Sequence, residues 1–429
     1  MSSGESDPVV VVGSGPSGLM QALHLARNCG RRVIVVEQQQ RNGGMFVSAT
    51  TPWGLVDQGV HLLQETGVPE FDELLFEVMP EDQWHIYDGA RKDIAGNFFR
   101  GRLDQGSLYP DLRRLDAADH ARIVSEIMTC AASPPATLSA ARTLREYLET
   151  RFGPHATELV FRPIAMKFWG HGLEELSPWA AKVVHLSRVV VHDAGETLRL
   201  KSDPALDAVL GFPDQLAFPE HLRTNRRRAL YPRAFGLSHV VDGLCRALDR
   251  HGVERINGAA VSGMEVSNHR VAALGLTLGE AKRRVPASAV LWTSPPQALL
   301  PLLGRQVSAA TDAPVPHRVA HLFFDAPPAT GALYWLWSYD PANALVRVSN
   351  PRAYCPEAGR SGAYPVCVEM HVGAVAVDDA SVIDRAETEL RATGLVPDGA
   401  RRVGGAVLPG HRGFPVPTIR NCAAIRAHW

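Results

Sequence analysis

The residues best suited to chemistry lie near the start of the chain, where glycines alternate with small residues. The run Gly13-Ser14-Gly15-Pro16-Ser17-Gly18 has the spacing G-x-G-x-x-G. At that spacing the first glycine allows a tight turn, the second lets the backbone approach a pyrophosphate, and the third lets a helix pack closely on a strand. Glu37 lies nineteen residues after Gly18, where such sites place a carboxylate for the hydroxyls of a ribose. The pattern indicates a dinucleotide-binding site.

The flanking sequence predicts the elements that would position these residues. Residues 9–12 are consecutive valines, as expected of a parallel strand buried on both faces. Residues 19–28 have apolar residues at helical spacing, so a helix would begin at the glycines and direct its free N–H groups toward phosphate. Residues 32–36 form a second apolar strand that ends at Glu37. This strand–turn–helix–strand order favours a nucleotide site over a glycine-rich loop without a ligand.

Length and composition limit the class of protein. A chain of 429 residues, 45% hydrophobic and 21% charged, is typical of a globular protein with two domains. A net charge of −1 argues against a nucleic-acid or membrane-surface partner. The six cysteines are scattered without a C-x-x-C pair, which favours reduced thiols in the cytoplasm. The histidines form no close ligand pair, so we expect no metal site. The oligomeric state is not indicated.

A second glycine pair extends the nucleotide pattern. Gly43-Gly44 follows Glu37 after an interval of five residues, and plain nicotinamide dehydrogenases do not need such a pair there. Together with the first three glycines and the acidic residue, the pair resembles the FAD-binding fold of the superfamily that contains amine oxidases, protoporphyrinogen oxidases and UDP-galactopyranose mutase. The resemblance is specific over residues 9–61 and looser over most of the remaining chain. It implies FAD rather than NAD as the cofactor.

The resemblance also assigns cofactor contacts. In the family a D-x-G-x-H segment passes the flavin, and the run from Asp57 to His61 matches it. A later valine lends its backbone N–H and C=O groups to adenine. The candidate cofactor-binding residues are Gly13, Ser14, Gly15, Pro16, Ser17, Gly18, Glu37, Gln38, Gly43, Gly44, Met45, Gly59, Val60 and Val261. His61 is the candidate catalytic residue, as a base or an orienting donor. A strand histidine bonded within a core is the alternative.

The resemblance implies an α/β fold with two interleaved domains. One is a Rossmann-like FAD-binding domain, and the other is an α+β substrate domain with a mixed sheet and a helical layer. We expect the first to comprise residues 1–61, 226–305 and 401–429. We expect the second to comprise residues 62–225 and 306–400, with its helical part at about 138–225. In the family a C-terminal helix contacts the flavin, and here a helix is expected from Asn421.

Candidate substrate residues come from two regions. Tyr231 and Arg233 lie in a Y-P-x-x-G-like turn that the resemblance places on the substrate side of the flavin. Residues 334–339 and 344–350 alternate as strands, and the family's sheet floor implies contacts from Trp337, Arg347 and Asn350. Four arginines between positions 223 and 228 could bind phosphate or carboxylate through paired hydrogen bonds, with a solvated basic loop as the alternative.

Three functions follow from these observations. The first is an FAD-dependent oxidoreductase that accepts a hydride from a small-molecule substrate, with phosphate-bearing compounds and sugar nucleotides among the candidates. The second is a non-redox sugar-nucleotide mutase, in which reduced flavin is the nucleophile. The third is a flavin-binding protein without catalysis. Only one nucleotide fingerprint is evident in the sequence, which makes enzymes with a second NADPH site less favoured.

Overall fold

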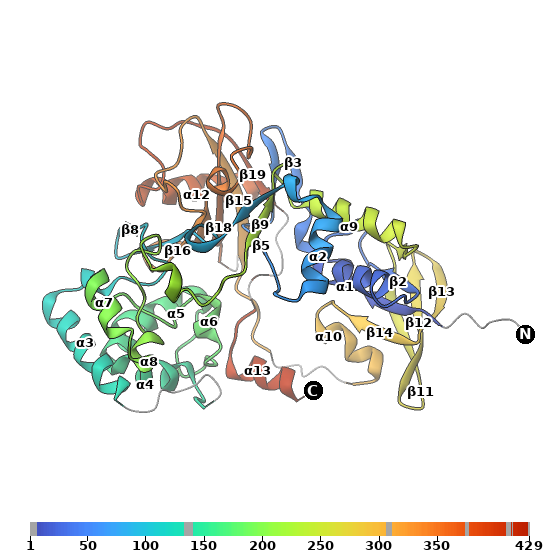
Figure 1. Cartoon of the computed structure of the whole chain (residues 1–429), viewed down its shortest axis with the longest axis horizontal. Helices are drawn as coiled ribbons and strands as arrows, with labels where there is room; N and C mark the ends of the chain where they lie inside the picture. Colours follow the sequence, from blue (N-terminus) through green and yellow to red (C-terminus); the bar gives the residue numbers. More distant parts are fainter. Residues whose placement is uncertain are drawn as a thin grey trace, which may run out of the picture. The chain divides into compact units, whose positions relative to one another are not determined.

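The computed structural model describes residues 7–132, 140–305, 311–373, 377–408, 413 and 415–427. The chain divides into two compact units. The first unit is made of Met1–Gln58, Leu62–Ile86 and Arg227–Ala309. The second unit is made of Gly59–His61, Tyr87–Arg226 and Ala310–Trp429. Each unit is therefore assembled from segments that are far apart in the sequence, as the colours of Figure 1 show.

A four-stranded parallel sheet forms the centre of the first unit. Its strand order is β10-β2-β1-β14, with every neighbouring pair parallel. The strands are β1 (Val9–Val12), β2 (Val33–Val36), β10 (Glu254–Ile256) and β14 (Ala289–Trp292). All four residues of β1 and of β2 are buried. The valine run is therefore a strand covered on both faces, as predicted from its lack of polar alternation.

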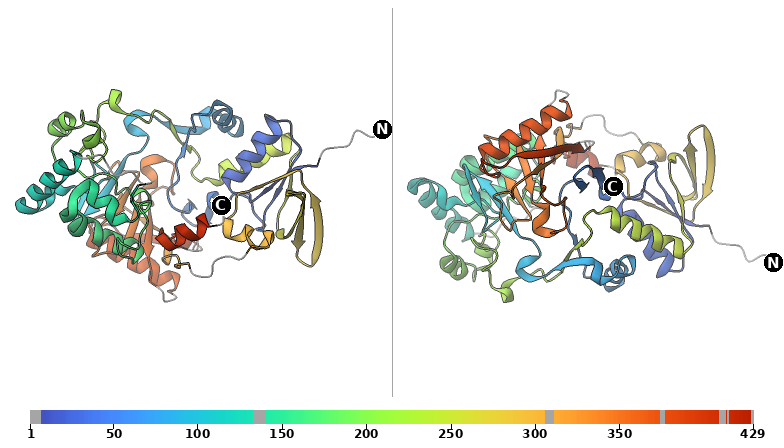
Figure 2. Two further views of the ribbon diagram at one scale, coloured as in Figure 1. Left: turned by 90° about the horizontal axis from the view of Figure 1, so that it is seen from below. Right: turned by 90° about the horizontal axis from the view of Figure 1, so that it is seen from above.

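Helices and a second, antiparallel sheet cover this centre. Helix α1 (Pro16–Arg27) packs on α9 (Ser238–Arg250) and α2 (Pro69–Val78), and the blue and yellow-green helices lie side by side in Figure 2. The three-stranded sheet β11-β12-β13 consists of Ala260–Ser267, Arg270–Leu278 and Ala281–Pro286. The remaining elements are β3 (Ala49–Thr51), β4 (Gly54–Val56), β5 (Leu63–Gln64), β6 (Trp84–Tyr87), β9 (Ala229–Pro232) and α10 (Pro296–Leu299).

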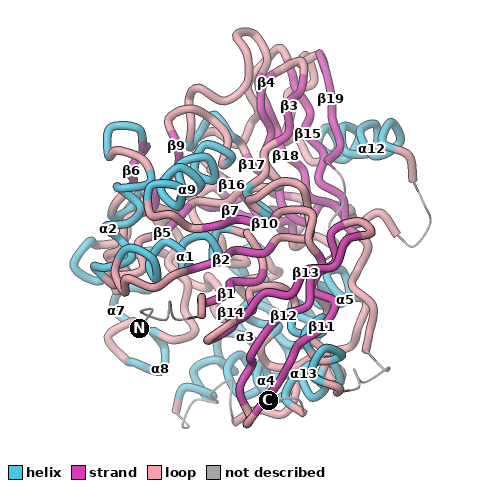
Figure 3. Tube along the Cα trace, turned by 90° about the vertical axis from the view of Figure 1, so that its right-hand side faces the viewer, coloured by secondary structure: helices cyan, strands magenta, loops and turns pink. Residues whose placement is uncertain are grey.

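A seven-stranded mixed sheet forms the centre of the second unit. Its order is β19-β15-β18-β17-β16-β7-β8, and several of its strands can be followed in Figure 3. The strands are β7 (Ala95–Phe99), β8 (Arg102–Asp104), β15 (His317–Phe324), β16 (Trp335–Ser338), β17 (Leu345–Ser349), β18 (Tyr364–His371) and β19 (Arg402–Leu408). Among these pairs only β16 and β7 run parallel. The mixed sheet expected for the substrate domain is present.

Helices form a layer that shares one hydrophobic core with this sheet. They are α3 (Ala117–Ala131), α4 (Leu144–Ala156), α5 (Arg162–Trp169), α6 (Ala180–Val183), α7 (Ala194–Leu200) and α8 (Pro204–Asp207). The unit also contains α11 (Pro351–Tyr354), α12 (Asp379–Ala392), which packs on β15 and β19, and α13 (Ile419–Arg426). A π-helical turn, Thr157–Phe161, joins α4 to α5. Among the helices that the structure describes, none combines the length and the apolar character needed to cross a membrane.

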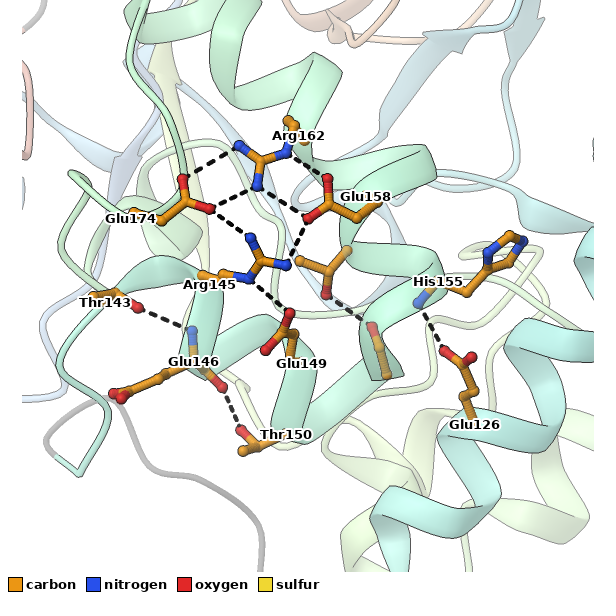
Figure 4. Close-up of polar contacts among 12 residues, drawn as sticks. Glu126, Thr143, Arg145, Glu146, Glu149, Thr150, His155, Glu158, Arg162 and Glu174 are labelled. Atoms are coloured by element: carbon orange, nitrogen blue, oxygen red, sulfur yellow. Dashed lines mark hydrogen bonds and ion pairs between the residues drawn. The ribbon is translucent and has the colours of Figure 1, made fainter.

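Ion pairs link the helices of this layer on their exposed side (Figure 4). Arg145 bonds Glu149 at 2.8 Å and Glu174 at 2.6 Å. Arg162 bonds Glu158 at 2.5 Å and Glu174 at 2.7 Å. The hydrogen bond from Arg162 lowers the pKa of Glu174 to about 2. The network joins α4, the π-helical turn and α5 to the loop that follows α5.

Three segments lie in a different unit from the one that the sequence predicted: residues 59–61, residues 62–86 and the described residues after 400. Residues 62–86 belong to the first unit, where β5 and β6 flank β9. Residues 402–408 form β19, which pairs with β15 in the second unit. Gly405 permits this pairing under α12, because a Cβ there would lie 2.9 Å from Ile383. The predicted boundaries differ from the two units at these segments, because residues 62–86 and 402–408 each contribute strands that pair with strands distant in sequence.

Candidate functional site

The first three glycines form the turn between β1 and α1. Gly13 has φ of +103° and donates its N–H to the carbonyl of Val36 at 2.8 Å. A Cβ at Gly18 would lie 2.1 Å from the carbonyl oxygen of Gly13, so only glycine fits there. Gly15 is the N-cap of α1 and has no side chain to bond the first N–H groups of the helix. These groups and the positive end of the helix dipole are suited to an anion.

The second glycine pair lies directly against this turn. Gly43 donates its N–H to the carbonyl of Ser14 at 2.8 Å. A Cβ at Gly44 would lie 3.1 Å from the Cα of Gly15. No described atom lies within 4 Å of the position that a Cβ on Gly15 would occupy. The two glycine motifs therefore meet around an open backbone surface, which fits the close approach of a pyrophosphate.

Glu37 lies at the end of β2, where its carboxylate is held by the same turn. One carboxylate oxygen accepts two hydrogen bonds from Ser14, one from its backbone N–H at 2.8 Å and one from its side-chain hydroxyl at 2.7 Å. The other oxygen accepts the N–H of Gln39 at 2.8 Å. A carboxylate oxygen offers more than one acceptor direction, so Glu37 retains capacity for a ribose hydroxyl. The predicted ribose acceptor and the glycine turn are thus brought together.

The other predicted cofactor residues vary in position. Pro16 and Ser17 begin α1, while Gln38 and Met45 are exposed near Glu37 and Gly44 in sequence. Val261 lies on β11, where the pairing with β12 shifts register just after it. A register shift interrupts the ladder and leaves backbone groups for other partners. The start of β11 is tied to β2, because Ala259 donates its N–H to the carbonyl of Glu37 at 2.9 Å.

Tyr231, a predicted substrate contact, is held within the first unit. It is fully buried and donates its hydroxyl to Asp57 at 2.5 Å. Asp57 also accepts the hydroxyl of Ser48 at 2.6 Å and the N–H of Leu237 at 3.1 Å. A buried carboxylate requires such donors. The first residue of the D-x-G-x-H segment therefore anchors the segment to β9 and to the start of α9.

The arginine-rich stretch is occupied by contacts within the protein. Arg223 donates to the carbonyl of Phe218 at 2.9 Å. Arg228 bonds Glu65 at 2.7 Å and Glu81 at 3.3 Å. Arg233 is exposed and donates its Nε–H to the carbonyl of Asp82 at 2.8 Å. These bonds support loops and strand ends, and a phosphate contact from this stretch stays a prediction.

The segment Gly59–His61 belongs to the second unit and runs against its sheet. Gly59 has φ of +88°, and a Cβ there would lie 2.8 Å from a carboxylate oxygen of Glu369. Val60 is buried and His61 is half-buried. Glu369 accepts the Nε–H of Arg347 at 2.6 Å. The predicted flavin segment is thus close to one of the predicted substrate residues.

Cross-strand pairing places Arg347 in a row of four residues that are aligned across neighbouring strands of the sheet. The register aligns Glu369, Arg347, Trp337 and Asn97 on four successive strands. Trp337 is 4% exposed and packs against Phe168, with ring centroids 5.8 Å apart. Its indole packs within the core, and the substrate contact stays a prediction.

Asn350 is also committed to the protein. It is buried, and its side-chain amide donates to the hydroxyl of Thr330 at 3.3 Å and to the carbonyl of Gly331 at 3.2 Å. These bonds hold the loop before β16, and the substrate contact of Asn350 stays a prediction.

Three site residues were not found from the sequence. Glu369 is a charged residue within an otherwise apolar strand, a pattern that signals a buried charge. His185 has φ of +55°, unusual for a residue with a side chain, and its ring lies 6.2 Å from that of Trp337. Burial, and then the charge of Arg347, lower the pKa of His185. Burial likewise lowers the pKa of His371 to about 4. These histidines are neutral at pH 7.

Comparisons with known proteins agree with this architecture. Residues 11–77 match the family described as an NAD(P)-binding Rossmann-like domain. The structure of reduced UDP-galactopyranose mutase is 15% identical, with coverage of 98% of this chain and 85% of that one and a TM-score of 0.73. A putative protoporphyrinogen oxidase from Exiguobacterium sp. 255-15 is 14% identical, with coverage of 98% and 90% and a TM-score of 0.63. Cyclohexylamine oxidase from Brevibacterium oxydans IH-35A is 15% identical, with coverage of 97% and 90% and a TM-score of 0.55.

The chain has the fold of these proteins. The predicted α/β class with a Rossmann-like domain is confirmed, and so is the resemblance in fold to the amine oxidase, protoporphyrinogen oxidase and mutase group.

Proposed function

We propose that this protein is an FAD-dependent oxidoreductase that accepts a hydride from a small-molecule substrate. The proposal depends on the backbone surface that the glycines of the first unit form. No described atom lies within 4 Å of a Cβ placed on Gly15, and a Cβ on Gly44 would lie 3.1 Å from the Cα of Gly15. When bound, the flavin would supply the hydride acceptor. The names of structures with the same fold, among them two amine oxidases, support an oxidase.

The chain's own residues would bind and orient the cofactor. The N-terminus of α1 and the turn around Gly15 would hold the pyrophosphate, and Glu37 would accept the ribose hydroxyls. Gly44 and Met45 would follow the pyrophosphate toward the flavin, and the backbone of Val261 would bind adenine. Gly59 and Val60 would contact the flavin.

His61 is the proposed catalytic residue. It follows the Gly59 turn directly and is half-buried, so it keeps a partly exposed imidazole. An imidazole can remove a proton from a substrate or orient one by a hydrogen bond. A His61→Gln variant should therefore slow reduction of the flavin by substrate while leaving the flavin content unchanged.

A sugar-nucleotide mutase is the second candidate. It is supported by the likeness to reduced UDP-galactopyranose mutase over 98% of this chain. The arginine-rich stretch predicted to bind a diphosphate supports it less, because Arg223, Arg228 and Arg233 each donate to an acceptor within the protein. A flavin-binding protein without catalysis is the third candidate.

The absorbance of the purified full-length protein tests the cofactor. We expect flavin bands in the wild type and their loss in Gly15→Val, whose side chain would fill the open surface. Gly399→Val is a matched control, because no described atom lies within 4 Å of a Cβ at either glycine. A colourless wild-type protein that FAD cannot reconstitute would contradict both enzyme proposals.

A second experiment separates the oxidoreductase from the mutase. Under anaerobic conditions, bleaching of the oxidised flavin by candidate amines or alcohols would support the oxidoreductase. Conversion of UDP-galactopyranose only after reduction by dithionite, with no net redox change, would instead support the mutase.

A further inference from the structure

We propose that Glu369 is a specificity-determining residue that neutralises Arg347, so that this face of the second unit binds an uncharged group of the substrate instead of a phosphate or carboxylate. The inference rests on the proposed function, because it names the class of substrate for that enzyme.

The two side chains form a buried ion pair whose position is set by the sheet. Arg347 on β17 and Glu369 on β18 are direct cross-strand partners. The Nε of Arg347 donates to Oε1 of Glu369 at 2.6 Å. The carboxylate side chain is 3% exposed and the arginine side chain 18%. A charge-assisted hydrogen bond in such a poorly hydrated position is stronger than the same bond at the surface.

Neighbouring groups keep Arg347 beside Glu369. A Cβ at Gly59 would lie 2.8 Å from Oε1 of Glu369 and 3.4 Å from Nη2 of Arg347, so the Gly59 backbone lies directly against the pair. The guanidinium carbon lies 5.4 Å from the centroid of the Trp337 ring. His317 faces the other carboxylate oxygen at 3.7 Å. The guanidinium is therefore confined between a glycine turn and an indole.

This arrangement leaves no excess positive charge on the pair. An incoming phosphate or carboxylate would have to displace Glu369 or accept a like charge beside it, and both are unfavourable in a poorly hydrated site. His185 and His371, which border the same region, have lowered pKa values and add no charge at pH 7. An uncharged hydroxyl or carbonyl group meets no such repulsion.

The affinity for inorganic pyrophosphate tests the inference. Isothermal titration calorimetry on the full chain with FAD would compare the wild type, Glu369→Gln and the double variant Glu369→Gln/Arg347→Gln. We expect Glu369→Gln to bind pyrophosphate at least about tenfold more tightly than the wild type, because the guanidinium loses its counter-charge. The double variant should lose this gain. Pyrophosphate bound at the glycines of the first unit would not respond to Arg347.

Two further variants keep the inference testable if Glu369→Gln does not fold. Glu369→Asp retains the negative charge and should bind pyrophosphate as the wild type does. Arg347→Gln alone should leave the affinity for pyrophosphate unchanged. A tenfold weaker affinity in Arg347→Gln, or no gain in a folded Glu369→Gln, would overturn the inference.

The two proposals fail in different ways. Calorimetry requires no turnover, and the comparison of Glu369→Gln with the double variant can also be made on protein without FAD, so a colourless protein would contradict the oxidoreductase and leave the affinity comparison measurable. A flavoprotein that is bleached by substrate but binds pyrophosphate through Arg347 would contradict only the role of Glu369.

Discussion

Replacement of His371 by phenylalanine should make the protein less sensitive to acid. The imidazole lies at the end of β18, with its ring 6.3 Å from Phe168 and 6.2 Å from His317. Burial lowers its pKa to about 4, and the charges of His317 and Lys167 lower it further in the same direction, while the carbonyl of Pro316 opposes them weakly. Phenylalanine keeps the planar ring and cannot bind a proton.

The magnitude follows from the difference between the folded and the unfolded pKa. The unfolded chain protonates His371 near its ordinary pKa of 6.5, whereas the folded protein does so only near about 4. Between these values the unfolded state binds more protons, so the free energy of unfolding falls as the pH falls. Well below pH 4 the free energy of unfolding is lower by about 3.4 kcal/mol because of His371. About 2.4 kcal/mol of this loss arises between pH 7 and pH 4.5.

Urea unfolding followed by tryptophan fluorescence at pH 7 and at pH 4.5 would measure this loss. The wild type should lose about 2.4 kcal/mol more than His371→Phe between the two conditions, because all other groups are shared. The exposed His221 provides a control, since His221→Gln should follow the wild type. Equal losses in the wild type and His371→Phe would refute the reasoning, because the buried histidine would then not be the group responsible.

Three more variants test particular contacts. Gly18→Ala should lower the free energy of unfolding by about 2–3 kcal/mol and abolish flavin binding, because its Cβ would lie 2.1 Å from a backbone oxygen; thermal melting and flavin absorbance would show both effects. Tyr231→Phe should cost about 1.5–3 kcal/mol, measured by urea unfolding, because buried Asp57 loses a donor; an unchanged midpoint would contradict this. Arg162→Ala should cost no more than about 1 kcal/mol, and less in 1 M salt, because its partners are about half exposed.

Part of this structure could be predicted from the sequence, because it depends on interactions between residues close together in the chain. The valine run and the spacing of Gly13, Gly15 and Gly18 predicted the first strand, turn and helix, because φ, close packing and burial on both faces act over a few residues. Glu37 and the pair Gly43-Gly44 were placed correctly at the same turn. Resemblance to a known fold then predicted the mixed sheet of the second unit.

The hydrogen-bond and ion-pair partners of polar side chains could not be predicted in this way. Tyr231 is a predicted substrate contact, whereas its hydroxyl donates to Asp57, a residue from a distant part of the chain. The arginine-rich stretch is predicted to bind phosphate, whereas Arg228 bonds Glu65 in the structure. Pairing of β5 with β9 brings these two residues together. Nothing local predicts such pairs, because each depends on which strands become neighbours.

The sequence by itself determined the nucleotide turn, since glycine spacing and strand burial are properties of short segments. Only the tertiary structure decided that Arg347 faces Glu369 and that residues 402–408 complete the sheet of the second unit. Strand register across a sheet selects which side chains meet, and it is set by packing over the whole unit. The dinucleotide turn is thus encoded locally, whereas the charge balance of the sheet face arises from the fold.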